Sequence, residues 1–357
     1  MISTHPRNYG LDIFRSISII FVVVVHGSFM LDNTFLNGFP YIPMIDTVDM
    51  FFVLSGFLIG LILIKEINQS QSYNPRDILI FWKRRWFRTL PNYYLFLFLN
   101  IVLTKLTIIN NDIHHLNWSF FFCLQNFNHM FQAFFWESWS LCIEEWFYIL
   151  FPILLFILLK KINAKYSFLI ATVIMIVFPI LLRAINTNSQ VDDYIYENTF
   201  RKIVIFRLDS IAYGLLAAWV YYYYNLIWVK LKYLFLSLGL GLIYFLLHFD
   251  APNTGFYKQV VHLVLSPVAA MLILPFMESM KTGKGILVKV FTHISKISYS
   301  MYLVNLALVS QIISANFPIK NETDGIIKYV IYWALVIAIS TLIYRYFEKP
   351  IMKLRDK

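Results

Sequence analysis

An arginine and a histidine share the first apolar stretch of the chain. In GLDIFRSISIIFVVVVHG, Arg15 precedes His26 by eleven residues. Burying either side chain in apolar surroundings costs free energy, so ionisable groups inside a membrane are functional candidates by default. On a helix, eleven residues rise about 16 Å and return to nearly the same face. We therefore expect both side chains to project into one seam at different depths.

Carboxylates lie in two later apolar stretches. Asp49 is near the start of TVDMFFVLSG, and the adjacent Glu144 and Glu145 lie in ESWSLCIEEWFYILFP. Neighbours on a helix point about 100° apart, so only one of these glutamates can face the seam directly. A histidine with a carboxylate partner can act as a general base. We expect this role for His26, oriented by Asp49 or Glu144. The alternatives are a plain interhelical hydrogen bond for His26 and a structural role for Glu145.

The segment FWKRRWFR carries the second group of cations. Its Arg85 and Arg88 are three residues apart and therefore share a helix face. With Arg15 they form a cluster expected at the inner membrane surface. A planar guanidinium matches the oxygens of a phosphate, so the cluster suits a phosphate-bearing ligand. For Lys83 and Arg84 we prefer the role of topological anchors.

The composition is that of a polytopic, all-α membrane protein. Of the 357 residues, 59% are hydrophobic and 14% are charged, and the mean hydropathy is +0.64. The net charge of +10 could suggest nucleic acid, but the charges lie in short loops between apolar runs, so we expect no nucleic-acid partner. Two cysteines exclude a disulfide framework or a cysteine metal cage. The spacing of His114, His115 and His129 does not match a metal pattern, and we expect no metal.

A spanning helix needs about 20 mostly apolar residues, and ten runs approach this length. They are roughly 11–31, 44–64, 86–104, 139–159, 166–185, 203–224, 229–248, 256–279, 297–315 and 326–347. No internal repeat or appended soluble domain is evident, so residues 1–357 are predicted to form a single transmembrane domain.

The distribution of basic residues predicts the orientation. With the amino terminus inside, 21 of the 30 Lys and Arg residues fall in inner segments and 8 in outer ones. Because cytoplasmic loops carry an excess of Lys and Arg, we expect both termini to be cytoplasmic.

Taken in order, the motifs resemble those of the membrane acyltransferase-3 family, the O-acyltransferases that modify surface glycans. The resemblance runs along the whole chain and is carried by these stretches: GLDIFRSISIIFVVVVHG, VDMFFVLSGFLIG, RRWFRTLPNYY, WSLCIEEWFYILFP, RLDSIAYGLLAAW, ISYSMYLVN and FEKP. Each stretch is weak evidence alone, but seven in this order are specific. The family's glutamate would then be Glu144, and its R-x-x-R element would be Arg85 and Arg88.

The resemblance implies an acyl-CoA donor, usually acetyl-CoA, that enters the protein from the cytoplasm. We expect the protein to lie in the inner membrane of a bacterium. It implies a hydroxyl of a surface glycan or a lipid-linked oligosaccharide as acceptor. On this basis Arg15, Arg85 and Arg88 are expected to bind the donor. The family motifs also supply the residues expected to bind substrate, which are Trp139, Ser140, Arg207, Asp209, Tyr302 and Asn305.

Two departures from many family members bear on the site. Many have a histidine at the end of the S-Y-x-x-Y-L motif, where this chain has Asn305, which makes His26 the stronger candidate for the base. Many also carry a carboxyl-terminal extracytoplasmic domain. We expect none after Lys357, and a separate partner for some acceptors.

Direct transfer to the acceptor and an acyl-histidine intermediate both remain open, as does the oligomeric state. A multi-helix transporter or flippase of a lipid-linked sugar is the alternative function, because it would also have about ten helices and buried charges. A membrane scaffold is a third possibility, which the number of buried ionisable groups disfavours.

Overall fold

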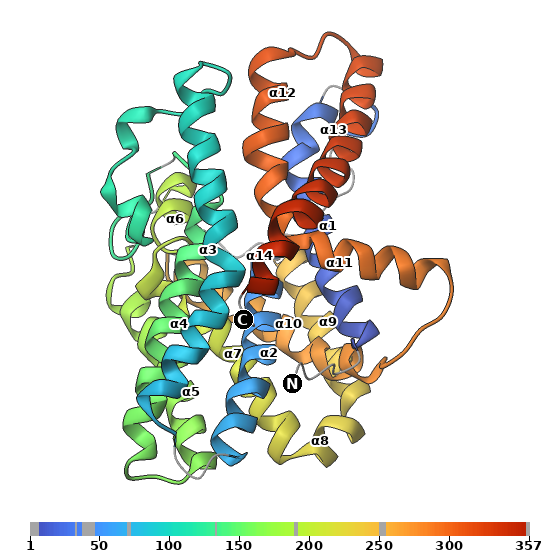
Figure 1. The fold of residues 1–357 in the computed structure, drawn as a ribbon. Helices are drawn as coiled ribbons and strands as arrows, with labels where there is room; N and C mark the ends of the chain where they lie inside the picture. The colour runs from blue at the N-terminus through green and yellow to red at the C-terminus, as the bar shows by residue number, and fades with distance from the viewer. Residues whose placement is uncertain are drawn as a thin grey trace.

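The computed structural model describes residues 7–32, 34–37, 47–69, 73–132, 134–188, 192–249 and 255–354. Within these ranges the chain forms helices and the segments that join them, with no strand (Figure 1). The prediction of an all-α, polytopic membrane protein is confirmed.

Helices of two sizes build the bundle. The longer ones are α1 Tyr9–Gly27, α2 Thr47–Gln69, α3 Pro75–Lys105, α4 Ser138–Leu159, α5 Ala164–Ile185, α7 Val204–Tyr223, α9 Lys232–His248, α10 Leu263–Ser279, α11 Ile286–Val304 and α13 Glu322–Ile343. The shorter ones are α6 Asp193–Asn198, α8 Asn225–Lys230, α12 Gln311–Asn316 and α14 Lys349–Leu354. Short 3₁₀ turns cover Ser28–Leu31, Ile113–His115 and Trp118–Phe122. Three π-helical turns cover Tyr257–His262, Asn305–Ser310 and Tyr344–Glu348.

Eight helical segments within the described ranges are long and apolar enough to cross a membrane. Two of the ten expected runs behave differently. Run 229–248 falls on α9, whose 17 residues rise only about 26 Å against a hydrocarbon core of about 30 Å. Run 86–104 falls on α3, a helix of 31 residues whose first half is strongly basic. The first residues of run 44–64, residues 44–46, lie outside the described ranges.

Close contact between α2 and α7 forms the centre of the bundle. A Cβ atom added at Gly56 of α2 would lie 2.0 Å from the carbonyl oxygen of Ile211, and one added at Gly214 of α7 would lie 2.0 Å from that of Val53. No side chain fits at either position, so each glycine is needed for the approach of the opposite backbone. This is the small-residue packing by which membrane helices associate closely.

The start of α3 fixes the register of the basic segment that follows it. The backbone N–H of Arg76 donates to Oδ1 of Asn74 at 3.0 Å, and that of Asn74 donates to Oδ2 of Asp77 at 2.8 Å. This reciprocal capping box, with Pro75 in the first turn, is a strong signal for a helix start. Arg84, Arg85 and Arg88 follow about two and a half to three and a half turns later.

A change of helical geometry interrupts the path from α11 to α12. After Val304 the backbone widens into the π-helical turn Asn305–Ser310 and then returns to α-helix at Gln311. Such turns are frequent at functional sites. This one packs against α1 and α13 and places Asn305 at its first position.

Candidate active site

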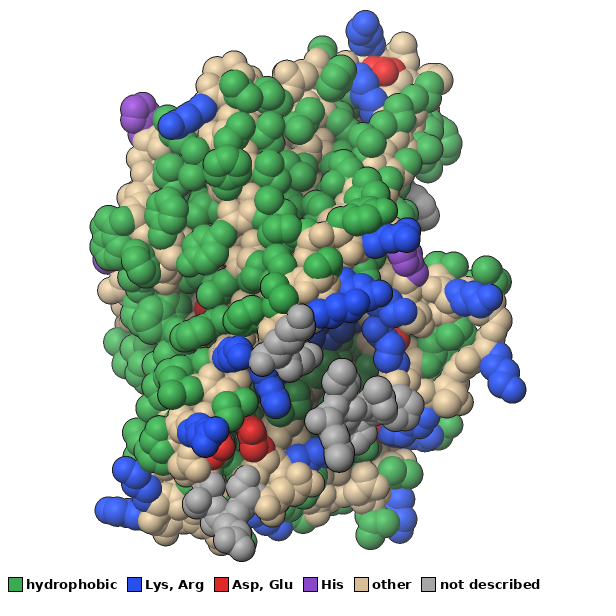
Figure 2. All heavy atoms as spheres, in the orientation of Figure 1, with side chains coloured by type: hydrophobic (Ala, Val, Ile, Leu, Met, Phe, Trp, Pro, Cys, Tyr) green, Lys and Arg blue, Asp and Glu red, His purple; other side chains and the backbone are tan. Residues whose placement is uncertain are grey.

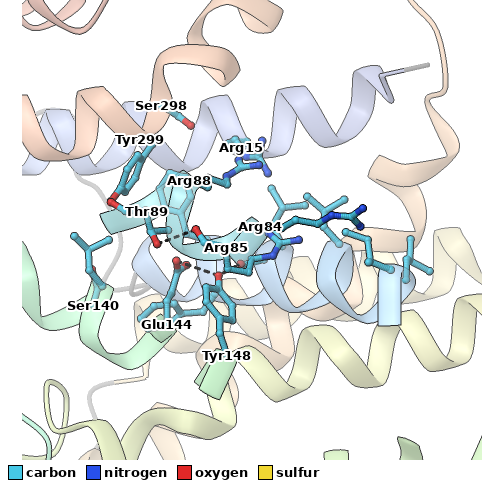
Figure 3. A pocket seen from close by; sticks show the side chains of 18 of the residues that line it. Arg15, Arg84, Arg85, Arg88, Thr89, Ser140, Glu144, Tyr148, Ser298 and Tyr299 are labelled. Carbon is cyan, nitrogen blue, oxygen red and sulfur yellow. Dashed lines mark hydrogen bonds between the residues drawn. The ribbon is translucent and has the colours of Figure 1, made fainter. Parts of the chain in front are cut away.

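A cavity of about 830 Å³ lies between α1, α2, α3, α4 and α11. Figure 3 shows its side chains: Arg15 and Arg84 lie toward one side, and Ser140 and Thr89 lie toward the other. On the molecular surface, Lys and Arg side chains gather around a hollow near the middle of the face shown in Figure 2. The cavity therefore has a cationic part and a part lined by hydroxyl and carboxyl groups.

The cationic part brings together the three arginines expected to bind the donor. Arg15 comes from α1, while Arg85 and Arg88 come from α3, and all three line the cavity. Arg84 lines it too. Arg84 is exposed at the rim of the bundle, and its expected role as a topological anchor stays a prediction beside its place in the cavity wall.

Arg85 is held by aromatic rings. Its guanidinium carbon lies 5.7 Å from the ring centre of Phe81 and 5.9 Å from that of Tyr148. Stacking of this kind supports a guanidinium and restricts its orientation.

Of the two adjacent glutamates of α4, Glu144 lines the cavity and Glu145 does not. The hydroxyl of Tyr148, one turn later, donates to Oε2 of Glu144 at 3.1 Å and lies 2.7 Å from Oγ of Ser55. The neighbouring Glu145 is buried and accepts a hydrogen bond from the hydroxyl of Thr89. The two glutamates thus point to different surroundings, as their adjacency on a helix requires.

Ser140 and Tyr302 close the polar part of the cavity. Their hydroxyl oxygens lie 2.6 Å apart, which joins α4 to α11. Both residues line the cavity, and both were expected to bind substrate. The Tyr302 hydroxyl also lies 3.3 Å from the backbone oxygen of Glu137, in the residue just before α4.

His26 contacts Asn305, which follows Tyr302 by about one helical turn. Its Nδ1 is 2.5 Å from Oδ1 of Asn305, and the amide nitrogen of Asn305 donates to the backbone oxygen of Tyr302 at 2.7 Å. His26 itself does not line the cavity. The eleven-residue spacing in α1 therefore places Arg15 in the cavity wall but not His26, whose ring contacts an amide and not the carboxylate we expected.

Asp49, Arg207 and Asp209 are found in two buried ion pairs. Arg207 pairs with Asp49 across α7 and α2, and Arg183 of α5 pairs with Asp209 of α7 at 2.6 Å. All four side chains are fully buried. Charges removed from water need an opposite charge nearby, so these pairs explain why the residues occur inside the bundle without any reference to substrate. The orientation count places both Arg183 and Arg207 among the eight basic residues of the outer segments.

Trp139 packs against α2 on one side and against the segment before α7 on the other. Its ring is 5.0 Å from the guanidinium carbon of Arg201 and 6.2 Å from the ring centre of Phe52, in an edge-to-face contact. The structure thus makes Trp139 part of the wall between α2, α4 and the segment before α7.

Several residues of the site were not singled out from the sequence. Tyr148 and Thr89 follow Glu144 and Arg85 by one turn each, so helical spacing alone could have suggested them. Glu137 gave no such signal. Within the described part of the chain, no group of three or more His, Cys, Asp or Glu side chains could hold a metal ion.

Comparison with known proteins adds a family to this geometry. Residues 8–345 match a family model described as an acyltransferase domain, of the acyltransferase-3 type. The chain is 28% identical over 379 aligned residues to a putative O-acetyltransferase of Staphylococcus aureus strain COL. It is 28% identical over 378 residues to the O-acetyltransferase OatA of Staphylococcus aureus strain NCTC 8325. Each alignment covers 96% of this chain and 57% of the relative, so the chain spans little more than half the length of these relatives. No solved structure matches.

Proposed function

The chain belongs to the acyltransferase-3 family, and on that premise we propose that it is a membrane O-acyltransferase. It moves an acyl group, expected to be acetyl, from acyl-CoA to a hydroxyl of a surface or lipid-linked glycan. We place it in the cytoplasmic membrane of a bacterium, with the donor supplied from the cytoplasm. The names of its Staphylococcus aureus relatives support O-acetyl transfer.

The cavity is the observation that carries the proposal. It joins four arginines and a lysine to two carboxyl groups, of Glu66 and Glu144, and to several hydroxyl groups within one space. Its volume of about 830 Å³ lies within the range of about 300–1,000 Å³ that is usual for small-molecule sites. A ligand with phosphates at one end and a reactive group at the other would match this distribution of charge.

Acyl-CoA has that character. Arg15, Arg85 and Arg88, helped by Arg84, would hold its phosphates through charge-assisted hydrogen bonds. The apolar side chains of α2 in the cavity wall, such as Leu58, would then line the path of the pantetheine arm. The thioester would lie toward Ser140 and Tyr302, because Asn305 bonds both to the backbone of Tyr302 and to the ring of His26.

In the proposed reaction, His26 takes the proton of the acceptor hydroxyl as its oxygen attacks the thioester carbonyl carbon. The carbon–sulfur bond then breaks, the ester is formed, and the CoA thiolate receives the proton from the imidazolium. Glu144 would stabilise positive charge that develops near the polar end of the cavity. The catalytic role expected for Asp49 stays a prediction. Because Asp49 forms an ion pair with Arg207, its effect on His26 would be indirect.

A deletion experiment tests the function. Base-labile O-esters on surface glycans should disappear when the gene is deleted and return with the wild-type gene. They should not return with His26→Ala, because the loss of a general base typically costs about 10²- to 10⁴-fold in rate. Equal amounts of folded protein in the membrane are the control. Glycans that keep their esters without the gene would support the transporter alternative instead.

A further inference from the structure

The side-chain amide of Asn305 has only one chemically sensible orientation. Its Nδ2 lies 2.7 Å from the backbone oxygens of both Met301 and Tyr302. Carbonyl oxygens only accept hydrogen bonds, so the amide group must direct its two N–H bonds at them. A flipped amide would set its own oxygen against two carbonyl oxygens at the same distance. The Oδ1 atom must therefore be the one that faces His26.

This orientation fixes the proton on the imidazole ring. Oδ1 of Asn305 carries no hydrogen, and it lies 2.5 Å from Nδ1 of His26. The hydrogen bond forms only if Nδ1 carries the proton. In the neutral ring the lone pair is then on Nε2, because one nitrogen is a donor and the other an acceptor.

The π-helical turn holds His26 at two points. Asn305, at the start of the turn, accepts from the ring, and Ser310, at its end, donates through Oγ to the backbone oxygen of His26 at 2.8 Å. The position of the imidazole relative to α11 thus depends on the geometry of this one turn.

Glu137 ties the turn to the first residues of α4. Its side chain is buried, with 2% exposed, and its Oε1 accepts the backbone N–H of Ala307 at 2.8 Å. The backbone oxygen of Glu137 also lies 3.3 Å from the hydroxyls of Ser140 and Tyr302. One residue therefore contacts both the polar end of the cavity and the turn that carries Asn305.

We propose that Asn305 is a positioning residue that keeps His26 in the Nδ1–H tautomer, so that Nε2 is the atom that accepts the proton, and that Glu137 is a second positioning residue that holds the turn. The assignment of His26 as the base rests on the proposed function. The tautomer does not, because it follows from the contacts of Asn305 alone. An amide in this place fixes the ring without adding a charge beside it.

Nitrogen-15 NMR of histidine-labelled protein in lipid nanodiscs tests the tautomer directly. The His26 signals are identified by their absence in His26→Gln. Wild-type protein should show a protonated Nδ1 and an unprotonated Nε2 above the pH at which the ring is charged. Asn305→Leu should lose this preference, and Asn100→Leu, a buried asparagine of α3 that bonds to Phe96, should keep it. A wild-type ring protonated at Nε2 would overturn the proposal.

Kinetics test the two positioning residues. Asn305→Leu and Glu137→Ala should each lower kcat by about 10²-fold, since a displacement of about 1 Å can cost that much, while the KM for the donor changes little. Glu137→Gln should restore most of the rate, because its amide oxygen can still accept from Ala307. The matched control is Glu278→Gln, at a buried carboxyl of α10 near the opposite end of α1.

The outcomes separate the two proposals. If Glu137→Gln is as slow as Glu137→Ala, the charge is required and the positioning role is wrong. If His26→Ala retains its rate while NMR shows the Nδ1–H tautomer, the contact stands and the catalytic role of His26 fails. If His26→Ala is inactive and Asn305→Leu is normal, the base stands and the role of Asn305 fails.

Discussion

At the scale of single residues, the cavity arginines differ in how the protein supports them. Arg85 is partly buried and stacked near Phe81 and Tyr148, whereas Arg84 and Arg88 are exposed along the same helix. A guanidinium that is fixed in advance loses less entropy when it binds a phosphate. Arg85 should therefore contribute more to donor binding than its more exposed neighbours.

Replacement of Arg85 tests this expectation. Arg85→Ala should weaken CoA binding by about 10- to 100-fold, because a hydrogen bond to a charged group is worth about 1.5–3 kcal/mol. Arg85→Lys should recover only part, since lysine lacks the planar fork. Isothermal titration with CoA and with dephospho-CoA gives both affinities. The matched control is Lys83→Ala, an exposed cation of α3 that does not line the cavity. Unchanged affinity in both Arg85→Ala and Arg88→Ala would show that these residues only set the topology.

The adjacent glutamates should respond differently to loss of charge. Glu144 lines the cavity, and we expect Glu144→Gln to lower turnover strongly at saturating donor. Glu145 accepts a hydrogen bond from Thr89, which a glutamine oxygen can also accept, so Glu145→Gln should alter turnover little. Both variants are assayed at matched amounts of folded protein. Full activity in Glu144→Gln would indicate a carboxyl that is protonated in the wild type, the serious alternative for a buried acid.

The sequence predicted those parts of the site that depend on helical periodicity. Arg15, Arg85 and Arg88 meet in one cavity because their spacing places them on inward faces. Contacts between side chains of different helices were harder to predict. His26 and Asn305 are 279 residues apart, so their contact depends on how α1 packs against α11, which local spacing does not encode.

At the scale of elements, the contact between α2 and α7 should be sensitive to substitution. Gly56→Ala should destabilise the protein, because its Cβ would lie 2.0 Å from the backbone oxygen of Ile211 and that backbone must move. Overpacking typically costs about 1–3 kcal/mol, which exceeds the gain of about 1 kcal/mol in helix propensity. Thermal unfolding in detergent, followed by fluorescence-detected gel filtration, should show a lower Tm.

Another glycine in a helix provides the control. A Cβ added at Gly241 of α9 meets nothing within 4 Å, so Gly241→Ala should leave the Tm unchanged or slightly higher. If Gly56→Ala is as stable as Gly241→Ala, the close approach of α2 and α7 contributes little to the stability of the protein.

Most helices could be predicted from hydropathy, but their irregularities could not. The expected runs agree with α4, α5 and α7 to within a few residues. The π-helical turn Asn305–Ser310 has the same composition as the helices on either side of it, so nothing in its apolar pattern marks the change. The side chain of Glu137, in the residue just before α4, accepts the backbone N–H of Ala307 within the turn, and these two residues lie 170 residues apart in the sequence.

At the scale of the whole molecule, the proposed reaction requires the two ends of the bundle to face different compartments. Figure 1 shows the segment after α3 and the connection from α12 to α13 at one end, and the connection from α4 to α5 with α8 at the other. The excess of Lys and Arg in the segments around α4–α5 and α8 predicts that this second end is cytoplasmic. Donor from the cytoplasm would then enter on the side of the arginines, while the acceptor would approach His26 from outside.

Cysteine labelling of intact cells tests this orientation. His114 follows α3, Lys161 follows α4, and both are exposed. His114→Cys should react with a membrane-impermeant maleimide in intact cells, and Lys161→Cys only after permeabilisation. The native Cys123 and Cys142 are buried and should give little background. Lys320→Cys, in the connection from α12 to α13, should behave like His114→Cys.

The reverse pattern would place the arginines outside, where CoA is not supplied, and would rule out a cytoplasmic donor. Labelling of both positions in intact cells would mean that α4 does not cross the membrane, although it is one of the eight helices long and apolar enough to do so.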